Sequence, residues 1–195
     1  MRACACAALL TGTLLFFWRP GQVAAQAPVL LPEGKQALQA KNFKRAEAIF
    51  TELAKKEPTA TSYGYLAVAE LSAGDAAESL AHFAEAHRLG NDSANFHYYW
   101  GLAYLQTKAP SPGIRELRLA LGKNPKLFEA NAALGVALLN AGLANEAISY
   151  LEQARSHSPG DAEIQASLVR AEFESGRTAA ALAGIDSAVE AIPEN

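Results

Sequence analysis

The sequence repeats itself with a period of about 34 residues, and this repetition limits the fold more than any other feature. One unit contains the pair Leu134-Gly135, then Leu151, and closes at Pro159. The same residue classes return one period upstream and one period downstream. Two further units upstream show the pattern less completely. The closing positions are Pro58, Asn91, Pro125, Pro159 and Pro193, separated by one interval of 33 residues and three of 34. A period of this length predicts a stack of similar structural units.

Each unit has the composition of two short helices. Alanine and leucine dominate, and both favour helix, while valine and isoleucine are sparse. Gly74, Gly142 and Gly176 stand where the first helix of a unit would end, a place that favours a residue with positive φ. The closing prolines stop the second helix because proline has no backbone N–H. We therefore predict an all-α chain built from helical hairpins.

The hairpins are expected to pack closely and then to stack. Small residues occur where the two helices of a unit would cross: Ala67, Gly101, Gly135 and Ala147. A single hairpin buries too little apolar surface to be stable, so neighbouring hairpins must stack on one another. The sequence thus predicts an α-solenoid with a concave face.

A 34-residue unit with a small residue after a large apolar one, then an alanine, a large apolar residue and a closing proline, resembles the tetratricopeptide repeat (TPR). The resemblance implies a right-handed superhelical solenoid of about five helix-turn-helix units. These units would span residues 28–59, 60–93, 94–127, 128–161 and 162–195. Two units depart from the pattern. Glu33 replaces a large apolar residue in the first, and the third has Gly113 for alanine and a run, KAPSP at 108–112, that predicts a longer turn.

Residues 1–27 have the layout of a secretory signal peptide. Arg2 precedes an apolar run over 3–18, and a stretch of small residues follows. Cleavage is expected after Ala25 or Ala27. The alternative is an uncleaved membrane anchor, although the run is shorter than the ~20 residues that a spanning helix needs. We expect an exported domain, periplasmic or extracellular, with no membrane contact unless the leader stays uncleaved.

Cysteine content and charge narrow the range of functions. Cys4 and Cys6 both lie in the leader, so the mature domain would have no disulfide, reactive thiol or cysteine metal site. Loss of the leader removes two arginines and no acid, which lowers the net charge from −3 to −5. This negative charge argues against nucleic acid as the main ligand.

One stripe of each first helix is a candidate groove for a partner. In the family that the repeat resembles, this stripe lines an inner groove that binds peptides or helices. The stripe comprises Val68, Leu71, Tyr98, Leu102, Leu105, Val136, Leu139, Arg170 and Phe173. It is mostly apolar, which suits a protein or peptide with apolar anchor residues. Some family members clamp a C-terminal carboxylate with basic and amide residues, which are missing here. Alternatively, the same side chains pack between the first helices of adjacent units.

Catalysis finds little support in the sequence, and we expect neither a cofactor nor a metal. His97 occupies a position that flanks the core and is expected to be structural, whereas His82, His87 and His157 are expected on the surface. Glu172 and Glu174 are expected to be solvated. No glycine-rich phosphate loop or nucleophile elbow is found. The prediction is therefore a non-catalytic, exported TPR adaptor or scaffold. The alternative is a structural protein of the cell envelope, either self-associating or tethered to the membrane as a spacer.

The two ends of the predicted solenoid differ in charge and polarity. The first unit holds six Lys/Arg against four Glu, and the last holds two Arg against six acids. No capping helix is expected after Pro193. The last helix carries the apolar residues Ala181, Leu182, Ile185, Ala188, Val189 and Ile192. Because exposed charges are screened beyond about 8 Å at physiological salt, we expect the apolar face to decide association. This predicts a weak homodimer through the C-terminal unit.

Overall fold

A computed structural model describes residues 27–190 of the protein. The predicted leader therefore lies outside the described residues except for Ala27, as does Ile192 of the last helix. Ten helices make up the described part of the chain, which contains no strand. They are α1 (Ala27–Gln39), α2 (Phe43–Lys56), α3 (Ala60–Ala73), α4 (Ala76–Arg88), α5 (Ala94–Gln106), α6 (Pro110–Lys123), α7 (Phe128–Asn140), α8 (Ala144–His157), α9 (Ala162–Glu174) and α10 (Thr178–Glu190).

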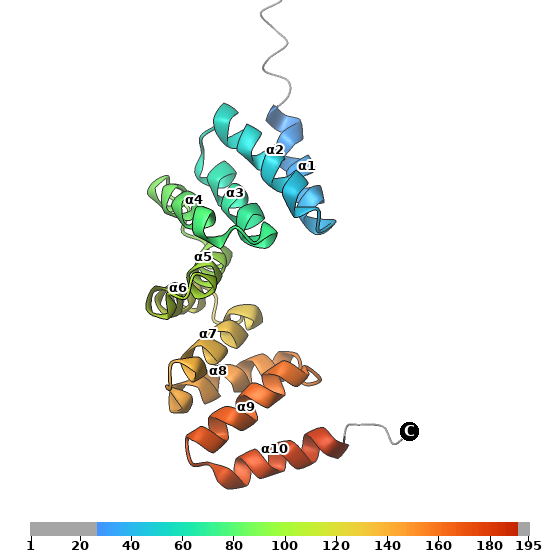
Figure 1. Ribbon diagram of the computed structural model, residues 1–195, viewed down its shortest axis with the longest axis vertical. Coiled ribbons are helices and arrows are strands. Elements are labelled where there is room, and N and C mark those ends of the chain that lie inside the picture. Colours follow the sequence, from blue (N-terminus) through green and yellow to red (C-terminus); the bar gives the residue numbers. More distant parts are fainter. Residues whose placement is uncertain (1–26, 191–195) are drawn as a thin grey trace, which may run out of the picture.

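The helices form five hairpins that stack one upon the next, with α1–α2 at one end and α9–α10 at the other (Figure 1). The second helix of each hairpin packs against the first helix of the following one. First helices of successive units also pack together directly, in the pairs α3–α5, α5–α7 and α7–α9. The structure is thus an all-α solenoid, as the period predicts, and these first helices lie side by side along one face of the stack.

Turns within the units follow the sequence prediction with one exception. Gly74, Gly142 and Gly176 have φ values of 99°, 76° and 80°, in the left-handed region where glycine is favoured. In the third unit Lys108 takes this place, with φ of 60°. The longer turn predicted there is wrong. Only residues 107–109 separate α5 from α6, because Pro110 begins α6, where a missing N–H leaves no helical bond unmade.

Small residues bring the paired helices close together, as predicted. A Cβ atom added to Gly135 on α7 would lie 2.6 Å from Cγ of Leu151 on α8. One added to Gly101 on α5 would lie 2.8 Å from Cγ of Leu117 on α6. Both distances are far below a normal contact between carbon atoms. The apolar residues that follow in the second helix therefore pack directly onto the backbone of the first.

The core follows the same period as the sequence. Phe50, Phe83, Leu117 and Leu151 hold one repeat position in the first four units, and each is completely buried. The same position in the fifth unit is Ile185, which is exposed. In the fourth unit this position, Leu151, lies in one core cluster with Leu168 and Ala171 of the following helix α9. No described helix follows α10, so Ile185 has no such cover within residues 27–190.

Side chains cap the starts of several described helices. Side chains of Thr59, Ser93 and Asp161 accept hydrogen bonds from backbone N–H groups at the starts of α3, α5 and α9. Among the helices of residues 27–190, none combines the length and apolar character that crossing a membrane requires.

Candidate interaction groove

A hollow of about 770 Å³ lies between α5 and α7 and extends to the start of α9. We call it the central hollow. Four of the nine side chains predicted for the groove line it together: Tyr98, Leu102, Leu105 and Val136. All four are half-buried, so that each has one side in the packed interior and another open to a ligand. The structure thus gathers an apolar floor from the first helices of two adjacent units.

Three other residues predicted for the groove do not line the central hollow. Leu71 and Leu139 are buried among the core side chains, and Val68 is half-buried against the cluster that contains Phe83. For the two buried leucines the alternative prediction, packing between units, describes what the structure shows. Both buried leucines lie in the last turn of a first helix, where the following unit covers them.

Polar side chains surround the floor of the central hollow. They are Lys108, Glu129, Asn140, Asp161 and Glu163. Three are acids and one is a base, so the charged groups that line this hollow are mostly negative. Asp161 also accepts hydrogen bonds from the N–H groups of Glu163 at 2.9 Å and Ile164 at 3.1 Å, which fixes its carboxylate at the edge of the hollow.

Tyr98 provides a polar group within this apolar floor. Burial raises the pKa of its hydroxyl to about 12, and the nearby Tyr99 and Glu129 act in the same direction. The hydroxyl therefore stays protonated at physiological pH and remains a hydrogen-bond donor. The centroid of its ring lies 4.9 Å from that of the Tyr99 ring, and this contact supports the position of the Tyr98 ring. Tyr98 can thus contribute both apolar area and one directional hydrogen bond.

The remaining two predicted residues, Arg170 and Phe173, line a second hollow of about 620 Å³ between α9 and α10. We call it the end hollow. Arg170 Nη2 donates to Asn140 Oδ1 at 2.8 Å, and its Nε lies 3.1 Å from Glu174 Oε1. Because Asn140 lines the central hollow, this hydrogen bond marks the border between the two hollows. The predicted groove is therefore two hollows rather than one continuous stripe.

Several polar residues lie elsewhere than the sequence predicts. Glu172, expected to be solvated, is buried, so that prediction is wrong. It occupies the repeat position of Leu138, a core residue on α7, and the period could have revealed this. His82 is half-buried and its Nδ1 lies 2.8 Å from Oε2 of the buried Glu70, whereas His87 and His157 are exposed as expected.

His97 is the most enclosed of the histidines. It is buried between two carboxylates, with Nδ1 at 2.9 Å from Glu116 Oε2 and Nε2 at 2.8 Å from Asp92 Oδ1. This arrangement agrees with the structural role expected from the sequence. Across residues 27–190, no group of three or more His, Cys, Asp or Glu side chains is placed to hold a metal ion.

Comparison with known proteins places the chain in a family. Tetratricopeptide repeat models match residues 31–94 and residues 138–195. The chain is a tetratricopeptide repeat protein. The TPR fold makes it a protein-interaction module, in a family whose members are typically non-catalytic. No curated protein sequence matches it significantly.

Solved structures agree with this TPR fold. The crystal structure of MamA is 20% identical with a TM-score of 0.74, and the alignment covers 86% of this chain and 92% of MamA. YrrB, described as a TPR protein with an unusual peptide-binding site, is 21% identical with a TM-score of 0.72, covering 84% of this chain and 85% of YrrB. At these identities the likeness concerns the fold alone.

Proposed function

We propose that this TPR protein is an exported adaptor or scaffold that binds an apolar segment of a partner protein in the central hollow. The observation that carries the proposal is the shared floor of Tyr98, Leu102, Leu105 and Val136, which is contributed by neighbouring first helices. Apolar hollows of this kind accept the anchor side chains of an amphipathic helix or an extended peptide. YrrB shows that a TPR protein of this fold can have a peptide-binding site.

The charges around the central hollow suggest the chemistry of the partner. Glu129, Asp161 and Glu163 outnumber Lys108, so a segment with basic residues beside its apolar anchors is favoured. Such charges act mainly on the association rate and on the choice of partner. A peptide that binds through its C-terminal carboxylate would meet repulsion here.

Substitution of the floor tests the proposal. Random peptides displayed on phage would be selected on the purified protein, and the affinity of the selected peptides measured by fluorescence anisotropy. Leu102→Gln and Val136→Gln are each expected to weaken binding by about tenfold, because loss of one apolar anchor contact typically costs 1–2 kcal/mol. Both side chains are half-buried and glutamine is a good helix former, so the helical circular dichroism should change little.

Two further variants serve as controls. Leu119→Gln alters an exposed leucine on α6 outside the hollow and should leave the affinity unchanged. Leu139→Gln alters a buried core leucine and should lower the free energy of unfolding instead. Selected peptides that bind both Leu102→Gln and Val136→Gln as tightly as the unaltered protein would place the binding site on another face.

The export of the domain has its own test. The chain would be expressed with its leader in a secreting bacterium, and the mass of the product in the periplasmic fraction measured. We expect an N-terminus at Gln26 or Pro28. A product of full mass in the membrane fraction would favour the alternative of a membrane-tethered spacer.

A further inference from the structure

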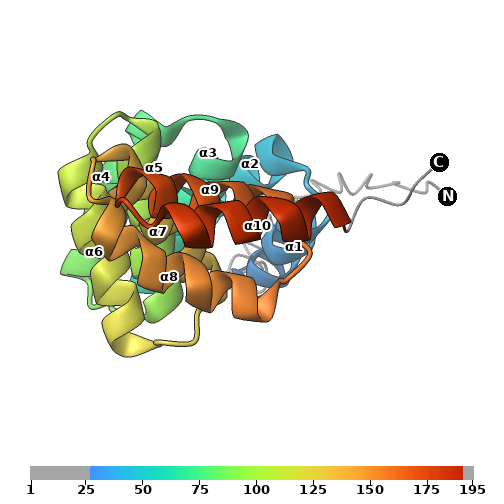
Figure 2. The same cartoon turned by 90° about the horizontal axis from the view of Figure 1, so that it is seen from below.

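The end hollow lies on a surface whose counterpart in the preceding, fourth unit is buried. In the fourth unit Leu139, Ile148 and Leu151 are at most 2% exposed. One period later the same positions hold Phe173, Leu182 and Ile185, which are 67%, 57% and 46% exposed. We call the surface formed by these three residues and Arg170 the end face. Figure 2 views the stack from this end, with α10 in front.

The end face is shaped to receive a helical hairpin. In the fourth unit the equivalent surface packs against Leu168 and Ala171 of α9, and all of these side chains share one core cluster. The end face repeats this surface in chemistry, with large apolar residues at each of the three positions. Its natural occupant is therefore another hairpin that presents an apolar face.

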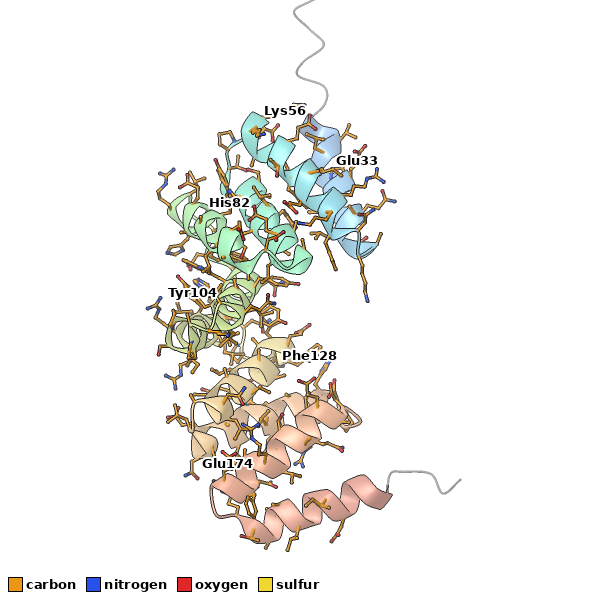
Figure 3. The ribbon with its side chains drawn as sticks, viewed as in Figure 1. Glu33, Lys56, His82, Tyr104, Phe128 and Glu174 are labelled. Carbon is orange, nitrogen blue, oxygen red and sulfur yellow. The ribbon has the colours of Figure 1, made fainter. Side chains whose placement is uncertain are left out.

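The opposite end of the solenoid does not supply such a face. Where α9 has Leu168 and Ala171, α1 has Glu33 and Gln36, and both are exposed. Figure 3 shows Glu33 on α1, at the far end of the stack from α9 and α10. Head-to-tail stacking of two copies would bury a carboxylate and an amide against apolar side chains without partners, which is costly. This polarity opposes growth into open filaments.

The charges on the end face are compatible with a second copy of itself. Arg170 and Glu174 form an ion pair there at 3.1 Å, and both side chains are about half exposed. A surface that carries one cation and one anion is complementary to itself across a two-fold axis, because each group can face its opposite on the copy. We infer that two copies of this chain pack through their end faces about a two-fold axis.

Sedimentation velocity of the protein at increasing concentration tests the inference. The unaltered protein should approach twice the monomer mass, whereas Leu182→Lys and Ile185→Lys should remain monomeric. Both side chains are exposed in the single copy, so circular dichroism should be unchanged. Val29→Lys and Leu119→Lys serve as controls, because they alter apolar side chains that are 48% and 44% exposed and lie outside the end face. Both variants should dimerise like the unaltered protein.

Cross-linking distinguishes a two-fold pair from head-to-tail association. The only cysteines of the sequence, Cys4 and Cys6, would be replaced by serine. Single cysteines at positions 173, 182 and 185 would then be treated with a flexible bis-maleimide. A two-fold pair places identical residues of the two copies near one another, so at least one position should give covalent dimers. Cysteine at position 29 should give none.

Several outcomes would overturn the inference. A protein that stays monomeric at millimolar concentration would show that two end faces do not pack together. Association that Val29→Lys abolishes, or that gives no cross-link at positions 173, 182 and 185, shows a different contact. The groove variant Leu102→Gln should still dimerise, so this result is independent of the proposed function.

Discussion

At the scale of single residues, His97 is a buried polar side chain held from two sides. Its two ring nitrogens lie within hydrogen-bond distance of two carboxylates, Nδ1 beside Glu116 and Nε2 beside Asp92. Lys123 Nζ lies 2.5 Å from Asp92 Oδ2, and Arg115 Nη2 lies 3.2 Å from Glu116 Oε1. This chain of polar contacts joins α5, α6 and the turn before α5, and so links the two helices of the third unit.

Removal of His97 should therefore cost far more than an average substitution. His97→Ala leaves the buried Glu116 carboxylate without its main partner, and breaking a buried pair in this way costs about 3 kcal/mol or more. Urea denaturation followed by circular dichroism measures the loss. In a double-mutant cycle, Glu116→Ala should cost less when His97 is already alanine. Additive costs would show that the two side chains do not stabilise each other.

The same cluster predicts a pH dependence on the acid side. Hydrogen bonds from His97 and Lys123 lower the pKa of Asp92 from 3.8 to about 2. Because the pKa is lower in the folded state, the stabilisation is fully present above pH 3.8 and is lost as the pH falls towards 2. Asp92→Asn should reduce the change of the melting temperature with pH between 3.8 and 2. Substitution of an exposed carboxylate elsewhere, Asp186→Asn, should not. An unchanged slope in Asp92→Asn would contradict the assignment.

At the scale of the helical elements, close packing within a hairpin depends on missing side chains. Gly135→Ala would place its Cβ 2.6 Å from Cγ of Leu151, and overpacking of this kind costs about 2 kcal/mol. Gly122 lies in α6, and an added Cβ would meet no heavy atom within 4 Å other than its chain neighbours and the backbone of its own helix. Gly122→Ala should therefore stabilise the protein by about 0.5–1 kcal/mol, since alanine favours helix over glycine. Urea denaturation compares the two, and equal effects would show that helix propensity alone decides.

The helices could be predicted from the sequence because the period fixes them, but not every contact follows the period. Leu71, Leu105 and Leu139 hold one repeat position, yet only Leu105 remains open to the central hollow. Burial at such a position depends on the side chains of the next unit, which the period leaves free to vary. The polar contact of His97 with Glu116 joins residues on different helices and appears in one unit only. Such cross-helix pairs leave no periodic signal in the sequence.

At the scale of the whole molecule, packing links each unit only to its neighbours. Helix contacts run from each hairpin to the next, and the first helices add contacts along one face of the stack. In such a chain the stability is close to a sum of unit and interface contributions, and a terminal unit can open by itself. The end unit α9–α10 packs on one side within the described residues and exposes its other side. Like α1–α2 at the other end, it should therefore be less protected in the monomer than the three central units.

Two equivalent substitutions test this view of the whole solenoid. Leu134 and Leu168 hold the same repeat position in adjacent units, and both are buried in one cluster. Leu→Ala at either site should cost about 2–5 kcal/mol locally. In hydrogen–deuterium exchange, Leu168→Ala should speed exchange in α9 and α10 and leave α1–α6 unchanged, because only the terminal unit opens. Leu134→Ala weakens contacts on both sides of the fourth unit, so exchange should rise from α5 through α10. Equal acceleration in all ten helices for both variants would instead show that the five units unfold as one.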